Sequence, residues 1–201
     1  MMMTEELTQK DTSKTNEFSQ LQETFGEAIV DVSQGIDCPV LVVNPASIVE
    51  VCHALKSQFG FEQMMDLCGV DMSEHPDYTD GSPQFEVVYH LLSITHNKRV
   101  RVKAKVQARE MIDSVTEVWA TANWYEREAF DMYGIIFNHH PDLRRILTDY
   151  GFEGYPLRKD FPLVGHAEMF FDEKQWRCVY KPNKLENRVL ISRTWPGADR
   201  G

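Results

Sequence analysis

The stretch that decides the fold is Lys98-Arg99-Val100-Arg101-Val102-Lys103-Ala104-Lys105-Val106. Its apolar and basic residues alternate strictly, which is the period of a β-strand with one buried face. The preceding apolar run, Phe85–Ile94, is separated from it only by Thr95-His96-Asn97. Two such runs joined by a short polar turn predict an antiparallel pair of strands. The basic row on the other face is either a solvated surface or a binding surface.

Weaker signals on both sides of this pair complete a domain. Asn44 before Pro45 is a helix start signal, because asparagine caps and proline suits the first helical position. Gly60 then ends the helix. The other expected elements are a helix over Asn16–Phe25, short strands over Ala28–Val32 and Val40–Val43, a helix from Pro45 to Phe59, a strand in the later half of Phe61–Asp71, a loop over Glu74–Gln84, a two-piece helical region over Met111–Tyr133 and a brief apolar run over Ile135–Phe137.

This order predicts a two-layer α+β domain over residues 16–137, in which helices pack on a mixed or antiparallel five-stranded sheet. Residues 1–15 are polar and carry no helix cap, so we expect them to be disordered.

The tail over residues 138–201 has a different character. It holds five of the nine prolines and shows no convincing amphipathic helix or sheet of its own. Disordered segments are poor in aromatic residues, and exposed large rings are avoided by soluble monomers. The tail is therefore predicted to be an extended arm that packs on partner subunits, with a small self-contained lobe as the alternative. Its aromatic residues are Tyr150, Phe152, Tyr155, Phe161, Phe170, Phe171, Trp176, Tyr180 and Trp195.

Composition excludes several classes of function. The net charge of −10 argues against a nucleic-acid-binding protein, since such binding needs clustered Lys and Arg. No apolar run approaches the roughly 18 residues of a membrane span, so we expect membrane association only through partners. The four cysteines form no Cys-x-x-Cys pair, and the N-terminal residues resemble neither a secretory signal nor a transit segment.

No motif assembles an active site. The carboxylates of Glu126 and Glu128 point roughly 200° apart on a helix, so they cannot flank one substrate bond. Arg127 and Asp131 are i,i+4 neighbours that can pair, which favours a structural ion network or a docking site. The pair His139-His140 lacks further metal ligands at a suitable spacing. We therefore expect no catalytic, cofactor-binding or metal-binding residues in this chain.

One long signature nevertheless resembles a known family. It consists of Glu126-Arg127-Glu128-Ala129-Phe130-Asp131-Met132-Tyr133-Gly134, His140, Leu143-Arg144-Arg145-Ile146-Leu147 and Thr148-Asp149-Tyr150-Gly151-Phe152-Glu153-Gly154-Tyr155-Pro156-Leu157-Arg158-Lys159-Asp160-Phe161-Pro162. These residues closely resemble the signature of the C subunit, or thirty-kilodalton subunit, of respiratory complex I (proton-pumping NADH:quinone oxidoreductase).

The resemblance implies a subunit of the peripheral arm without a cofactor of its own. FMN, iron–sulfur clusters and quinone would lie in partner subunits, and the C-terminal extension would contact the D, B and I subunits. The complex would be peripheral to the bacterial inner membrane on the cytoplasmic side, or on the matrix side if organellar. The residues expected at the partner interface are Glu126, Arg127, Glu128, Asp131, Tyr133, His140, Arg144, Arg145, Asp149, Tyr150, Phe152, Tyr155, Arg158, Lys159 and Asp160.

Within this set, Arg144, Arg145, Arg158 and Lys159 are expected to pair with acidic groups on the D or B subunits. The nearest alternative host is a related complex, such as a membrane-bound hydrogenase or a quinone reductase fed by another donor. A free-standing hydrolase is the alternative from a different class, and the sequence offers no motif for it.

Overall fold

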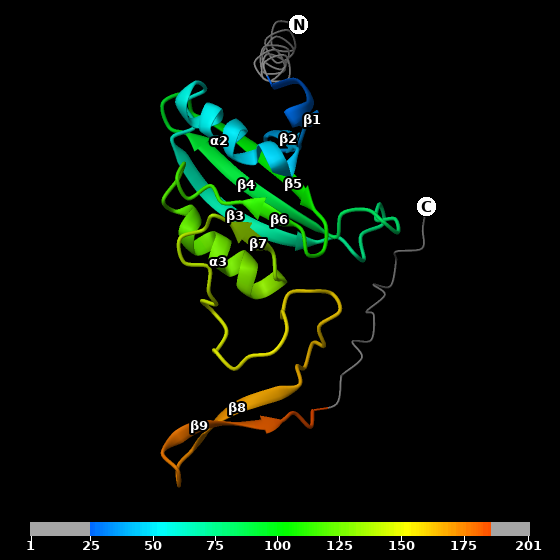
Figure 1. Cartoon of the computed structure of the whole chain (residues 1–201), viewed down its shortest axis with the longest axis vertical. Coiled ribbons are helices and arrows are strands. Elements are labelled where there is room, and N and C mark those ends of the chain that lie inside the picture. The colour runs from blue at the N-terminus through cyan, green and yellow to red at the C-terminus, as the bar shows by residue number, and fades with distance from the viewer. Residues whose placement is uncertain (1–24, 186–201) are drawn as a thin grey trace, which may run out of the picture. The chain divides into compact units, whose positions relative to one another are not determined.

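The computed structural model describes residues 25–185, and its centre is a five-stranded sheet (Figure 1). The strand order is β1-β2-β5-β4-β3. β2 and β5 pair in parallel, whereas the other neighbours are antiparallel. The expected mixed five-stranded sheet is therefore confirmed. The strands are β1 (Ile29–Gln34), β2 (Pro39–Val43), β3 (Gln63–Asp71), β4 (Phe85–Ser93) and β5 (Lys98–Val106).

The alternation of β5 places its apolar residues in the core. Val100, Val102 and Ala104 are at most 1% exposed, opposite Leu91, Tyr89 and Val87 of β4. On the other face, Lys103 pairs with Glu86 of β4 at 2.7 Å, and Arg101 pairs with Asp37 at 3.1 Å. Part of the basic row is thus neutralised within the chain.

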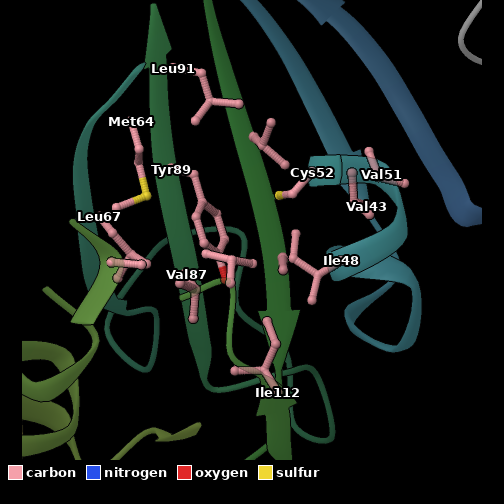
Figure 2. Close-up of a cluster of buried hydrophobic side chains, with 14 of the residues drawn as sticks. Val43, Ile48, Val51, Cys52, Met64, Leu67, Val87, Tyr89, Leu91 and Ile112 are labelled. Atoms are coloured by element: carbon pink, nitrogen blue, oxygen red, sulfur yellow. The ribbon is translucent and has the colours of Figure 1, made fainter. Parts of the chain in front are cut away.

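One face of the sheet is covered by α2 (Ile48–Ser57), as Figure 1 shows. Figure 2 shows Tyr89 at the centre of the buried cluster, with Leu67 of β3 on one side and Ile48 and Cys52 of α2 on the other. Residues of the later helix α3 (Ala122–Tyr133), Ala122 among them, join the same cluster, so both helices help to close one core.

One helical prediction needs correction, and another lies almost entirely outside the described residues. The chain after Asn44 first makes a 3-10 turn, η2 (Pro45–Ser47), and α2 ends at Ser57, so Phe59 lies beyond the helix. The Asn44 side chain does accept a hydrogen bond from the amide of Ala46, at 3.1 Å. The expected helix over Asn16–Phe25 lies outside the described residues except for Phe25, which precedes the 3-10 turn η1 (Gly26–Ala28).

The larger correction concerns the expected helical region over Met111–Tyr133. Its beginning is a strand, β6 (Met111–Asp113), and the helix α3 starts only at Ala122. β6 pairs in parallel with β7 (Ile136–Asn138), which follows the helix. Local periodicity could not reveal this strand because its hydrogen-bonding partner lies about 25 residues away in the sequence.

The chain divides between Lys159 and Asp160 into two compact units. The described part of the second unit contains a hairpin of β8 (Ala167–Asp172) and β9 (Arg177–Pro182), paired antiparallel. The expectation that the tail has no sheet of its own is therefore wrong. The packing of the tail on partner subunits stays a prediction.

Candidate partner interface

Asp131 organises the residues that carry the family signature. Its side chain is fully buried on α3, and one oxygen, Oδ2, accepts hydrogen bonds from the amides of Ile146, Leu147 and Thr148 at 3.1, 2.8 and 2.8 Å. The other oxygen accepts from the Thr148 hydroxyl and from Arg145, the latter at 3.1 Å. Burial acts to raise the pKa of Asp131, but the hydrogen bonds outweigh it and hold the pKa below its usual value. An ionised carboxylate thus fixes the segment after β7 against α3.

Two arginines reinforce this attachment, one on α3 and one on the segment itself. Arg127 of α3 donates to the carbonyl oxygens of Arg144 and Arg145, each at 3.0 Å. The guanidinium of Arg145 donates to the carbonyl of Gly154 at 3.1 Å and lies over the Tyr155 ring, 5.4 Å from its centroid. Arg127 and Asp131 therefore each hold the 144–148 segment, where the sequence suggested that they pair with one another.

The segment then crosses the end of α3 at Gly134. This glycine has φ +75°, and a Cβ there would lie 2.5 Å from Arg158 and 2.7 Å from the Tyr155 ring. Arg158 donates to the carbonyl of Tyr133 and stacks over Tyr155, 4.2 Å from the ring centroid. Glycine is required here both by the left-handed backbone and by the close approach of these side chains.

Glu126 belongs to a separate, buried network of hydrogen bonds. Its carboxylate accepts from the Ser114 hydroxyl at 2.6 Å and from the amide of Val115 at 2.8 Å. Burial raises its pKa to about 7, although these two hydrogen bonds oppose the shift. His140 lies 3.9 Å away, with its Nε2 3.0 Å from the carbonyl of Asn123 and its Nδ1 accepting from the amide of Asp142. With Nδ1 as an acceptor, Nε2 is the ring nitrogen that donates to the Asn123 carbonyl oxygen.

The attached segment and α3 together form an apolar groove of about 640 Å³. Trp124 of α3 is 71% exposed and Leu147 of the segment is 63% exposed, so two large apolar side chains face outward at this site. Glu128, one turn after Trp124, is the charged lining residue. The full lining is Ala120, Thr121, Trp124, Tyr125, Glu128, Ile146 and Leu147.

The expected interface residues differ in how exposed they are in the structure. Glu126, Asp131 and the ring of His140 are buried within this chain, and Arg127, Arg145 and Arg158 bind its own carbonyl groups. Tyr133, Phe152 and Tyr155 are half-buried. The exposed residues are Glu128, Arg144, Asp149, Tyr150, Lys159 and Asp160.

Sequence reasoning missed three contributors: Thr148, Trp124 and Leu147. Thr148 binds Asp131 through both its amide and its hydroxyl. Trp124 could have been found from its place one helical turn before Glu128, because side chains at i and i+4 share a helix face. Leu147 belongs to the signature but was not among the expected interface residues, since its position depends on the hydrogen bonds to Asp131.

Among residues 25–185, no helix is long and apolar enough to cross a membrane. The same residues contain no group of three or more His, Cys, Asp or Glu side chains that could hold a metal ion.

Comparisons with known proteins show the family. Residues 41–167 match the family described as "Respiratory-chain NADH dehydrogenase, 30 Kd subunit". Similar proteins named as the C subunit of NADH-quinone oxidoreductase include one from Hydrogenovibrio crunogenus, 45% identical over 86% of this chain and 91% of the relative. Another, from Laribacter hongkongensis, is 50% identical over 76% of this chain and 80% of the relative.

Solved structures share the fold. A trypsin-resistant fragment of Nqo5 matches with a TM-score of 0.56 and 27% identity, covering 65% of this chain and 99% of the fragment. A chain of an archaeal membrane-bound sulfane sulfur reductase matches with a TM-score of 0.60 over 75% of this chain and 86% of its own length. At 22% identity, the second match shows the fold alone.

The fold and the signature define the class of protein: a subunit of a multisubunit respiratory oxidoreductase. The family match spans more than half of the chain, and the relatives are covered over most of their length. The chain belongs to the family of the 30 kDa subunit of respiratory-chain NADH dehydrogenase, whose members carry the name of the C subunit of NADH-quinone oxidoreductase.

Proposed function

We propose that this chain is a structural and assembly subunit in the peripheral arm of a proton-translocating NADH:quinone oxidoreductase. It carries no cofactor itself, and electrons pass from NADH through FMN and iron–sulfur clusters of other subunits to quinone. Its role is to hold the cluster-bearing and quinone-binding subunits in position. Support comes from the family membership and from the names of the similar proteins.

The observation that carries this proposal is the attachment of the 144–148 segment to α3. Buried polar groups of the helix, above all Asp131, are used to fix backbone groups of the segment. The result is a groove whose segment side is hydrogen-bonded to α3, with Trp124 and Leu147 exposed at its surface. Rigid, exposed aromatic and aliphatic side chains are typical anchors of protein interfaces. The signature residues thus build a docking surface instead of an active site.

The proposed partners are the D, B and I subunits, with the complex on the cytoplasmic side of the bacterial inner membrane or the matrix side in an organelle. Arg144 and Lys159 are exposed and can reach acidic groups on the D or B subunits. Arg145 and Arg158 bind carbonyl groups within the chain, so we assign them to the support of the docking surface. Accurate support matters because displacements of about 1 Å near a reaction site can be costly.

The test replaces Trp124 or Leu147 with aspartate in the native complex. Both side chains are exposed, so the isolated chain should keep its fold, which circular dichroism checks. We expect either variant to reduce co-purification of the chain with the other subunits and to lower NADH:quinone reductase activity of the membranes. Ile36→Asp is the control, since Ile36 is fully exposed in the turn between β1 and β2 and lies outside the groove. Normal assembly of both groove variants would contradict the docking role.

A further inference from the structure

Two fully buried carboxylates on α3 have very different numbers of hydrogen-bond donors. Among the described residues, five donors bind Asp131, whereas two bind Glu126: the Ser114 hydroxyl and the Val115 amide. A carboxylate offers about four acceptor sites, so an ionised Glu126 would keep about half of them unfilled away from water. The protonated form avoids this cost because it carries no charge. Of the two groups, Glu126 therefore gains more from contact with water when it loses its proton.

The ring of His140 lies against Glu126 but forms its hydrogen bonds elsewhere. Both side chains are fully buried, and Nε2 of His140 lies 3.9 Å from Oε2 of Glu126. Nε2 donates to the carbonyl of Asn123 at 3.0 Å, and Nδ1 accepts from the amide of Asp142 at 3.0 Å. Both nitrogens of a positively charged ring are donors, so such a ring would place an N–H against the N–H of Asp142. The buried arrangement thus favours a neutral ring, which gives an ionised Glu126 no opposite charge.

The other titratable groups around Glu126 do not compensate its charge either. Cys52 of α2 and Tyr89 of β4 interact with it electrostatically, and burial raises the pKa of each, so both stay protonated at neutral pH. Asp113 of β6 is 41% exposed and lies 3.9 Å from the exposed His139, outside the buried pair. None of these groups brings a positive charge to the buried carboxylate.

The His140 ring is carried by a surface loop with a strained backbone. Its neighbours His139, Pro141 and Asp142 are all exposed. His139 has a φ of +61°, in the left-handed region that is unfavourable for residues other than glycine. Outward movement of the ring would let this backbone relax, and water can replace the two hydrogen bonds that the ring loses. The loop over residues 139–142 is therefore a removable cover over Glu126.

We propose that Glu126 and the 139–142 loop form a pH-dependent switch, in which the His140 ring stays buried while Glu126 is protonated and moves outward when Glu126 loses its proton, so that water reaches the carboxylate. The loop leads directly into the 144–148 segment, and Asp142 pairs with Arg144 at 2.8 Å. The start of the docking surface thus becomes sensitive to pH. This inference goes beyond the proposed function and concerns the chain by itself, so either one can fail while the other stands.

The size of the effect follows from proton linkage. Burial raises the pKa of Glu126 to about 7 in the closed form, whereas a hydrated Glu126 returns to its ordinary pKa of 4.5. The open form therefore binds fewer protons between these values. The ratio of open to closed molecules should rise roughly tenfold between about pH 6 and pH 8.

Modification by diethyl pyrocarbonate measures this ratio in the full chain, because the reagent attacks accessible, neutral imidazole rings. His139 is 78% exposed and serves as the internal reference for the direct effect of pH on the reaction. We expect the rate at His140 relative to His139, followed by mass spectrometry, to rise roughly tenfold between about pH 6 and pH 8. The ratio should stay constant in Glu126→Gln. Glu128→Gln is the matched control, since Glu128 is an exposed carboxylate on the same helix, and it should keep the wild-type response.

Three results would overturn the switch. The first is a constant ratio in the wild type, and the second is an equal rise in Glu126→Gln. The third is a rise that accompanies loss of the fold, which circular dichroism at each pH detects. Nitrogen NMR of the labelled wild-type chain adds a test that needs no variant. The His140 ring should be neutral at about pH 8, and a doubly protonated ring would show a buried ion pair with Glu126 and overturn the proposal.

Discussion

Replacing Asp131 with asparagine tests whether one buried carboxylate holds the docking surface together. The wild-type side chain accepts from three amides, one hydroxyl and one guanidinium. Asparagine keeps the size but has one acceptor oxygen, and its NH₂ group would face donors. Breaking a buried charged pair costs about 3–5 kcal/mol. Because the 144–148 segment can detach and become hydrated, we expect a value at the lower end of this range. The free energy of unfolding should fall by about 3 kcal/mol.

Hydrogen exchange locates this loss. The amides of Ile146, Leu147 and Thr148 all donate to Asp131, and a loss of about 3 kcal/mol corresponds to roughly 150-fold faster exchange. Urea unfolding of the same variant gives the total change in stability. Asp142→Asn is the control, because Asp142 forms an exposed ion pair with Arg144 that should be worth less than about 1 kcal/mol. If the three amides keep wild-type protection in the Asp131→Asn variant, the reasoning is refuted.

Three further predictions concern stability in urea. The pKa of Glu126 is raised from 4.5 to about 7, so its favourable contribution to the free energy of unfolding is complete below pH 4.5 and is lost as pH rises through 7. Glu126→Gln should remove this decline in stability, which is at most about 3 kcal/mol between pH 4.5 and 8. An unchanged pH profile of the variant would contradict this prediction. Gly134→Ala should lower the free energy of unfolding by at least about 2 kcal/mol, because the new Cβ meets Arg158 and the Tyr155 ring. Gly81→Ala is the control and should lower it by only about 1 kcal/mol, the cost of the backbone strain. Equal losses in the two variants would argue against the steric explanation. The buried hydroxyl of Tyr89 has no hydrogen-bond partner among the described residues. Tyr89→Phe should therefore leave the free energy of unfolding unchanged or raise it by up to about 1 kcal/mol. A clear loss of stability would show that the hydroxyl does form a hydrogen bond.

Local sequence patterns were sufficient where an element depends on its own residues. The alternation over Lys98–Val106 determined β5 and its buried face, because a strand's side chains alternate regardless of its partner. Asn44 and Pro45 marked the turn that leads into α2. The contiguous signature from Glu126 onward pointed to the family, which the comparisons confirm.

Side-chain roles within that signature required the tertiary structure. The spacing of Arg127 and Asp131 suggested that they pair with each other, but each binds groups 14 to 18 residues further along the chain. The sequence alone could not show which carboxylates are buried, so Glu126 and Asp131 were grouped with exposed residues such as Lys159.

The sequence by itself thus determined the central strand pair, the Asn44-capped turn that leads into α2 and the family, because these depend on periodicity, capping and a contiguous motif. Only the tertiary structure decided that β6 pairs with β7, that Asp131 fixes the 144–148 segment, and that Phe170 and Phe171 point to opposite faces of a hairpin. The physical reason is that these features arise from hydrogen bonds between residues distant in the chain, whereas a local pattern reports only on neighbours within about one helical turn.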